Sequence, residues 1–78
     1  MQEAELKQRF DDGALKQATA TPVPMASKGW HLVLTDKKSR QVVLQRQRGQ
    51  EREFSTLDAA FSAARRIGFR EMTVSAGL

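Results

Sequence analysis

The feature that most limits what this 78-residue chain can fold into is an amphipathic segment over residues 55–67. Its apolar side chains recur at the i, i+3, i+4, i+7 spacing that gathers them on one face of an α-helix: Leu57, Ala60, Phe61, Ala64 and Ile67. Ser55 is the predicted N-cap, Asp58 the acid of a capping box, and Gly68 the residue that ends the helix. Because one face of this helix is apolar, the rest of the chain must supply an apolar surface for it to cover.

That surface is predicted to be a small β-sheet. Residues 29–35 alternate, with Trp30, Leu32 and Leu34 on one face, so Trp30 is interpreted as a core anchor and not as a platform for base stacking. A polar turn over residues 36–39 leads into a return strand over residues 40–48, and residues 52–54 are a candidate for a short third strand. We expect the helix to be buried against this strand face through a defined set of residues: Leu57, Phe61 and Ile67 on Trp30, Leu32 and Leu44.

Three weaker patterns complete the expected element order. Residues 3–12 predict a short helix that docks through Leu6 and Phe10. Residues 14–23 predict an edge strand or an extended lead-in, because Pro22 and Pro24 cannot donate hydrogen bonds to a ladder. Residues 69–74 are a candidate last strand. The prediction is one small α+β domain over residues 1–78, with an N-terminal and a C-terminal helix on one face of a small antiparallel sheet of three to four strands. The element order is α-β-β-β-α with a possible last β, and the other sheet face is left to solvent or a partner.

Composition argues against several kinds of site. The chain has no cysteine and one histidine, so a single copy can build neither a disulfide nor a thiolate-bound or multi-histidine metal site. His31 lacks a matching nucleophile or second base and is predicted to be a surface residue, and Gly49 stands alone where a phosphate loop would need several glycines. We therefore expect no enzyme activity, no cofactor and no metal.

Segment hydropathy and size set two further expectations. No apolar run approaches the roughly 20 residues of a membrane span, and the polar N-terminus lacks the pattern of a secretory signal. We expect a cytoplasmic protein with no membrane partner. Because a core this small is marginal and nothing crosslinks it, a homodimer is also expected.

The charge of the chain is concentrated in one segment. Residues 37–70 carry nine basic and three acidic side chains, whereas the whole chain has a net charge of +4. A localised basic surface typically binds a polyanion, most often nucleic acid, and arginine forks bind phosphate bidentately. The predicted nucleic-acid-binding residues lie at the two ends of the hairpin and on the C-terminal helix: Arg40, Arg46, Arg48, Arg52, Arg65 and Arg66. An ordinary solvated surface rich in lysine and arginine is the alternative interpretation.

Two stretches of the sequence, PMASKGWHLVL and LQRQRGQEREFSTLDAAFSAARRIGFREMTV, resemble short proteins encoded on bacterial plasmids and mobile elements. These are described as partition- or stability-associated accessory proteins. The residues that carry the resemblance are Pro24-Met25, Gly29-Trp30, Gln47-Arg48-Gly49, Arg52, Phe54, Leu57-Asp58-Ala59-Ala60 and Ile67-Gly68-Phe69. The resemblance implies plasmid maintenance and supports DNA or a DNA-bound protein as the partner, and it supplies no site residues.

Three functions therefore compete. The favoured one is a non-catalytic accessory protein that binds nucleic acid, with DNA preferred, through the basic hairpin. The first alternative is a protein–protein interaction adaptor in a plasmid partition or transfer complex. The second is double-stranded RNA binding, because α-β-β-β-α is the element order of that domain; against it, the C-terminal helix begins STLDAA and lacks the expected lysine cluster.

Overall fold

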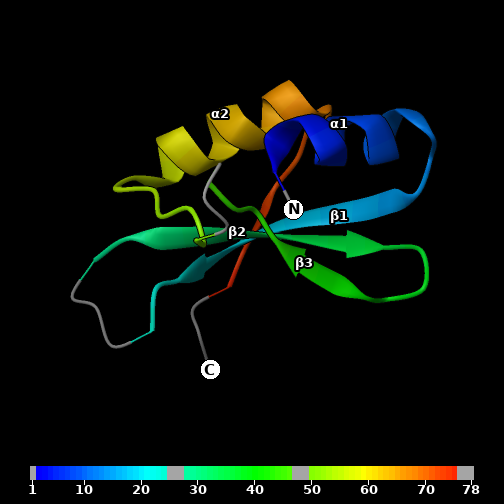
Figure 1. Cartoon of the computed structure of the whole chain (residues 1–78). Helices are drawn as coiled ribbons and strands as arrows, with labels where there is room; N and C mark the ends of the chain where they lie inside the picture. The colour runs from blue at the N-terminus through cyan, green and yellow to red at the C-terminus, as the bar shows by residue number, and fades with distance from the viewer. Residues whose placement is uncertain (1, 25–27, 47–49, 76–78) are drawn as a thin grey trace.

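A computed structural model describes residues 2–24, 28–46 and 50–75 and shows two helices over a four-stranded sheet (Figure 1). In chain order the elements are α1 (Glu3–Asp11), β1 (Leu15–Pro22), β2 (Trp30–Asp36), β3 (Gln41–Val43), α2 (Leu57–Ile67) and β4 (Thr73–Val74). The α+β class and both helices are thereby confirmed. Both helices lie on the same side of the sheet (Figure 1), so the opposite sheet face is open as expected.

The sheet is mixed, not purely antiparallel. Its strand order is β3-β2-β1-β4; β1, β2 and β3 pair as an antiparallel meander, and β4 pairs with β1 in parallel. The reason is the crossover: α2 carries the chain from the β3 edge over the sheet to the β1 edge, and a parallel neighbour needs such a connection. The expected last strand exists, but only Thr73 and Val74 belong to it.

The predicted edge position of β1 is therefore wrong. β1 lies inside the sheet, with β2 on one side and β4 on the other. β4 pairs only with Thr19 and Ala20, so Pro22 lies beyond that short ladder at the end of β1, where its missing N–H breaks no β1–β4 hydrogen bond. A proline near the end of a strand thus did not exclude that strand from the interior of the sheet.

The return strand is shorter than predicted. Only Gln41–Val43 form β3, and residues 52–54 form no strand of their own. The chain beyond β3 is held by isolated backbone contacts instead. Leu44 N–H donates to the carbonyl of Leu32 in β2 at 2.9 Å, and Arg52 N–H donates to the carbonyl of Leu44 at 2.9 Å. Trp30 of β2 and Phe54 exchange two backbone hydrogen bonds of 2.8 Å. Gly49, the predicted second turn, lies outside the described residues.

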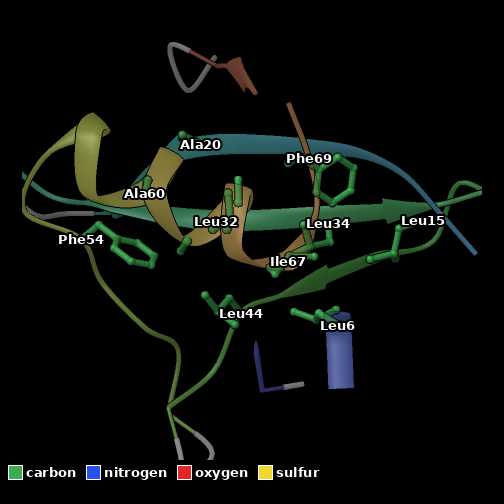
Figure 2. Packing of buried hydrophobic residues seen from close by; sticks show 13 residues of the cluster. Leu6, Leu15, Ala20, Leu32, Leu34, Leu44, Phe54, Ala60, Ile67 and Phe69 are labelled. Carbon is green, nitrogen blue, oxygen red and sulfur yellow. The ribbon is translucent and has the colours of Figure 1, made fainter. Parts of the chain in front are cut away.

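The core lies between the helices and the sheet, and it is built mainly from aliphatic side chains (Figure 2). Leu6 of α1, Leu32 and Leu34 of β2, Leu44 and Ile67 are fully buried. Phe10 packs partly buried against this cluster, so the docking of α1 through Leu6 and Phe10 is confirmed. Trp30 also packs against the core, half-buried, as the anchor interpretation expects.

The buried face of α2 differs from the predicted stripe. The fully buried residues of α2 are Ala60, Ala63, Ala64 and Ile67, whereas Leu57 and Phe61 are only half-buried. The sequence pattern centres the stripe on the large i, i+4 pair, but three buried alanines let α2 approach the sheet closely. The prediction that Leu57 and Phe61 are buried is therefore wrong, while Ile67 is buried as expected.

The N-cap of α2 lies one residue later than predicted. Thr56 is the N-cap, and its Oγ1 accepts a hydrogen bond of 3.1 Å from the backbone N–H of Ala59. Ser55 precedes the cap, and Asp58 stands at N2 in the first turn, where a carboxylate favours the helix dipole without forming a capping box. Gly68 ends the helix as predicted.

This geometry predicts different effects for two neighbouring hydroxyl residues. Thr56→Ala removes the acceptor for the Ala59 N–H and should lower the free energy of unfolding by about 1 kcal/mol. Ser55→Ala should change it by less than about 0.5 kcal/mol, because Ser55 is exposed and outside the cap. Urea unfolding followed by circular dichroism measures both; equal losses would show that the cap is not at Thr56.

Candidate nucleic-acid interface

Arg40, at the β2–β3 turn, belongs to a structural hydrogen-bond network. Asp36 at the end of β2 is 7% exposed and accepts hydrogen bonds of 2.9 Å from the backbone N–H groups of Lys38 and Arg40. The Arg40 Nε donates to the same carboxylate at 2.7 Å. The backbone N–H of Arg40, and after it the Arg40 guanidinium and the Lys38 N–H, hold the pKa of Asp36 below its ordinary value against the opposing effect of burial.

This network explains the shape of the turn and makes Arg40 a weaker candidate for binding phosphate. The Asp36 carboxylate closes the loop, and Ser39 takes the left-handed backbone conformation (φ 65°) that such a three-residue hairpin connection needs. Lys37 and Lys38 remain exposed at the tip. Asp36 balances the charge of Arg40, whose side chain is 67% exposed. We therefore regard the turn as a structural unit that carries three exposed basic residues.

A second group of arginines meets at the N-terminal end of α1. Arg66 of α2 binds the Glu3 carboxylate through two hydrogen bonds of 3.1 Å, from Nε to Oε2 and from Nη2 to Oε1. Arg52, from the segment after β3, places its Nη1 3.6 Å from Glu3 Oε1. Donation to Glu3 raises the pKa of Arg66 above its ordinary value. Glu3 thus ties α1, α2 and the returning segment together.

Arg46 stands beside this group. Its side chain is exposed, and its carbonyl lies 3.5 Å from the Gln2 side-chain nitrogen at the start of α1. Arg46 and Arg52 line, with Glu3, a shallow hollow of about 590 Å³ whose other lining residues are Gln2, Ala4, Gln45 and Glu53. We call Arg46, Arg52 and Arg66 the arginine cluster.

Each member of the arginine cluster is partly accessible. The side chains of Arg52 and Arg66 are 40% and 49% exposed. Arg52 also lies over the Phe54 ring, with its guanidinium carbon 4.9 Å from the ring centre. Stacking and ion pairing hold the guanidinium planes in place while leaving other N–H groups toward solvent.

Arg65 belongs to a different surface. It lies over the Phe61 ring at 5.9 Å, and Phe61 borders a hollow with Met72 and Glu71 next to β4. Arg66, the next residue, faces α1 instead. The two arginines therefore do not converge on one ligand, although the sequence places them side by side.

The structure thus distributes the predicted residues over three places. Arg40 lies at the β2–β3 turn, whereas Arg46 follows the opposite end of β3. Six residues of extended chain would separate the two by about 20 Å. Arg65 lies over the Phe61 ring, and Arg48 lies outside the described residues. Only Arg46, Arg52 and Arg66 come together.

Glu3 is the member of this candidate site that the sequence did not reveal. It lies 63 residues from Arg66 in the chain, and an acid in the first turn of a helix is explained equally well by the helix dipole. No local spacing links Glu3 to an arginine. The pairing could be found only once the two helices were placed side by side.

The prediction for His31 is wrong. His31 is 9% exposed, and its Nδ1 lies 3.7 Å from Glu51 Oε2. It faces the open side of the sheet, where the end of β1 and the segment after β3 enclose it. The hollow there, of about 930 Å³, is lined by His31 together with Val23, Pro24, Val42, Val43, Gln45, Arg46, Gln50, Glu51 and Glu53.

Two kinds of feature are absent from the part of the chain that the structure describes. Within it, no three histidine or acidic side chains gather as a metal site would require. None of its helices has the length and apolar character needed to cross a membrane. No protein-family model matches the chain, and no curated protein or solved structure is significantly similar to it.

Proposed function

We propose that this chain is a non-catalytic accessory protein that binds nucleic acid, DNA in preference, through the arginine cluster. The observation that supports this is the meeting of arginines from three separate segments. Arg46 and Arg52 line one shallow hollow with Glu3, and Arg66 binds the Glu3 carboxylate. Arginine forks held in place by a carboxylate or a ring suit phosphate better than flexible surface lysines do, because less side-chain entropy is lost for each hydrogen bond formed. The resemblance to plasmid-encoded accessory proteins favours DNA over RNA and plasmid maintenance as the setting.

The ion pairs with Glu3 leave enough donors for phosphate. A guanidinium has five N–H groups; Arg66 uses two on Glu3, and Arg52 has one of its nitrogens near it. Both side chains are about half exposed, so their remaining N–H groups can reach a ligand. Glu3 orients the arginines and at the same time lowers the net positive charge that a phosphate meets.

Salt dependence tests the proposal. Phosphate neutralisation releases counterions, so affinity for a duplex should fall with salt at a log–log slope of about −0.9 per contacted phosphate. Arg46→Ala should make the slope shallower by about one unit and leave folding intact, because this side chain is exposed. Glu3→Gln should strengthen binding, because it removes the competing carboxylate. Fluorescence anisotropy with a labelled random-sequence duplex measures the affinity of each variant.

Lys7→Ala is the matched control. Lys7 is an exposed cation on α1 that pairs with Asp11 at 3.8 Å, outside the arginine cluster, so its removal should leave the slope unchanged. An equal effect of Lys7→Ala and Arg46→Ala would mean diffuse attraction without a site. Absence of salt-sensitive binding at micromolar protein and about 50 mM salt would reject nucleic acid and favour the protein-interaction adaptor.

Double-stranded RNA binding is the second candidate, supported by the observed order of α1, three antiparallel strands and α2, with both helices on one sheet face. Against it, α2 begins at Leu57 with Asp58 in its first turn, which would repel phosphate. An RNA duplex of the same sequence, titrated in parallel, decides between the two; tighter binding to RNA would replace DNA in the proposal.

A further inference from the structure

Two large apolar side chains of α2 lie at the margin of the core, packed against it but not fully buried. Leu57 and Phe61 are half-buried, although the helix buries three alanines beneath it. Next to them, Met72 is half-buried and Val74 is 48% exposed. We call Leu57, Phe61, Met72 and Val74 the α2–β4 patch.

These four side chains belong to one surface. Leu57, Phe61 and Met72 line a hollow of about 380 Å³ between α2 and the chain that leads into β4. Val74 pairs in register with Ala20, whose side chain is buried under the helices, so Val74 points toward the helix side of the sheet. The α2–β4 patch is therefore an apolar strip along the edge of the helical layer.

Charges of both signs border the patch. Asp58 and Glu71 line the same hollow, and Arg65 lies over the Phe61 ring with its guanidinium carbon 5.9 Å from the ring centre. In a chain of net charge +4, this is an edge where acidic groups are at least as numerous as basic ones. Its chemistry therefore differs from that of the arginine cluster.

We propose that a second copy of this chain covers the α2–β4 patch in a two-fold symmetric dimer. In such a contact the same patch faces itself, so each Arg65 can meet Asp58 or Glu71 of the other copy around a shared apolar centre. A polyanion is disfavoured there by the two carboxylates. A domain of this size also gains stability from such burial, since its own core is small. This inference stands independently of nucleic-acid binding.

Sedimentation velocity at about 150 mM salt over the micromolar range tests the dimer. The unchanged chain should move from 8.7 kDa toward twice that mass as concentration rises. Arg65→Glu and Glu71→Arg should each weaken association at least tenfold, because each puts like charges face to face. An equimolar mixture of the two variants should recover the dimer, since opposite charges then meet across the axis.

Lys16→Glu makes the same charge change as Arg65→Glu at an exposed position on β1 and should leave association unchanged. Circular dichroism melts confirm that the exposed-residue variants fold. A monomer at about 500 μM would overturn the proposal, as would equal weakening by Lys16→Glu or a mixture that stays monomeric.

Discussion

Gly68→Ala should be among the most destabilising single substitutions in this chain, because it combines backbone strain with a steric clash. Gly68 has φ 138°, a conformation that residues with a side chain rarely adopt, and this strain costs about 1–3 kcal/mol. A Cβ there would lie 2.4 Å from Cδ1 of Phe10, so the ring would have to move, at a further cost of about 1–3 kcal/mol. Thermal and urea unfolding measure the sum.

The clash reaches beyond its own site because Phe10 holds α1 in place. The Phe10 ring packs edge-on against Phe69, with ring centres 4.8 Å apart. Displacing Phe10 would therefore loosen α1 and, with it, Glu3.

Two variants separate strain from clash. A Cβ at Gly13 would lie 3.9 Å from Lys37 Nζ and would clash with nothing. Because Gly13 has φ 77°, Gly13→Ala should lower the free energy of unfolding only by the left-handed backbone strain, roughly 1–2 kcal/mol. In the Phe10→Ala background the clash is gone, so adding Gly68→Ala should cost only the strain. If Gly68→Ala costs no more than Gly13→Ala, the close approach of Phe10 is wrong.

The sequence predicted the elements whose signals are local. The α1 docking residues, the alternation of β2 and the glycine that ends α2 were all identified correctly, because each depends on neighbours within one or two turns. The parallel pairing of β4 was not predicted. It depends on where α2 delivers the chain after crossing the sheet, and two residues of strand carry no directional signal.

The candidate site was only partly predictable, for a similar reason. Arginine content located the basic segment, but sequence proximity gave a false grouping of Arg65 with Arg66. Adjacent residues of a helix point about 100° apart, so Arg66 reaches Glu3 of α1 whereas Arg65 lies over the Phe61 ring of its own helix. The acids that pair with Arg40 and Arg66 also differ in origin: Asp36 is four residues away, whereas Glu3 comes from the other helix.

The second large effect is expected in α2, where the residues buried in the structure differ from those that the sequence predicts. Ile67→Ala should lower the free energy of unfolding by about 2–5 kcal/mol, because Ile67 is fully buried among side chains from both layers (Figure 2). That is a large part of the roughly 4–12 kcal/mol available to a domain of this length. Phe61→Ala should cost less than Ile67→Ala, although phenylalanine is the larger residue, because Phe61 is only partly buried at the margin of the core. Removing the Phe61 ring leaves little cavity and also removes the ring that Arg65 covers.

Urea unfolding at a protein concentration low enough to keep the chain monomeric compares the two variants without any contribution from a dimer. If Phe61→Ala lowers the free energy of unfolding more than Ile67→Ala, Phe61 belongs to the core as the sequence predicts. The α2–β4 patch would then lack its apolar centre.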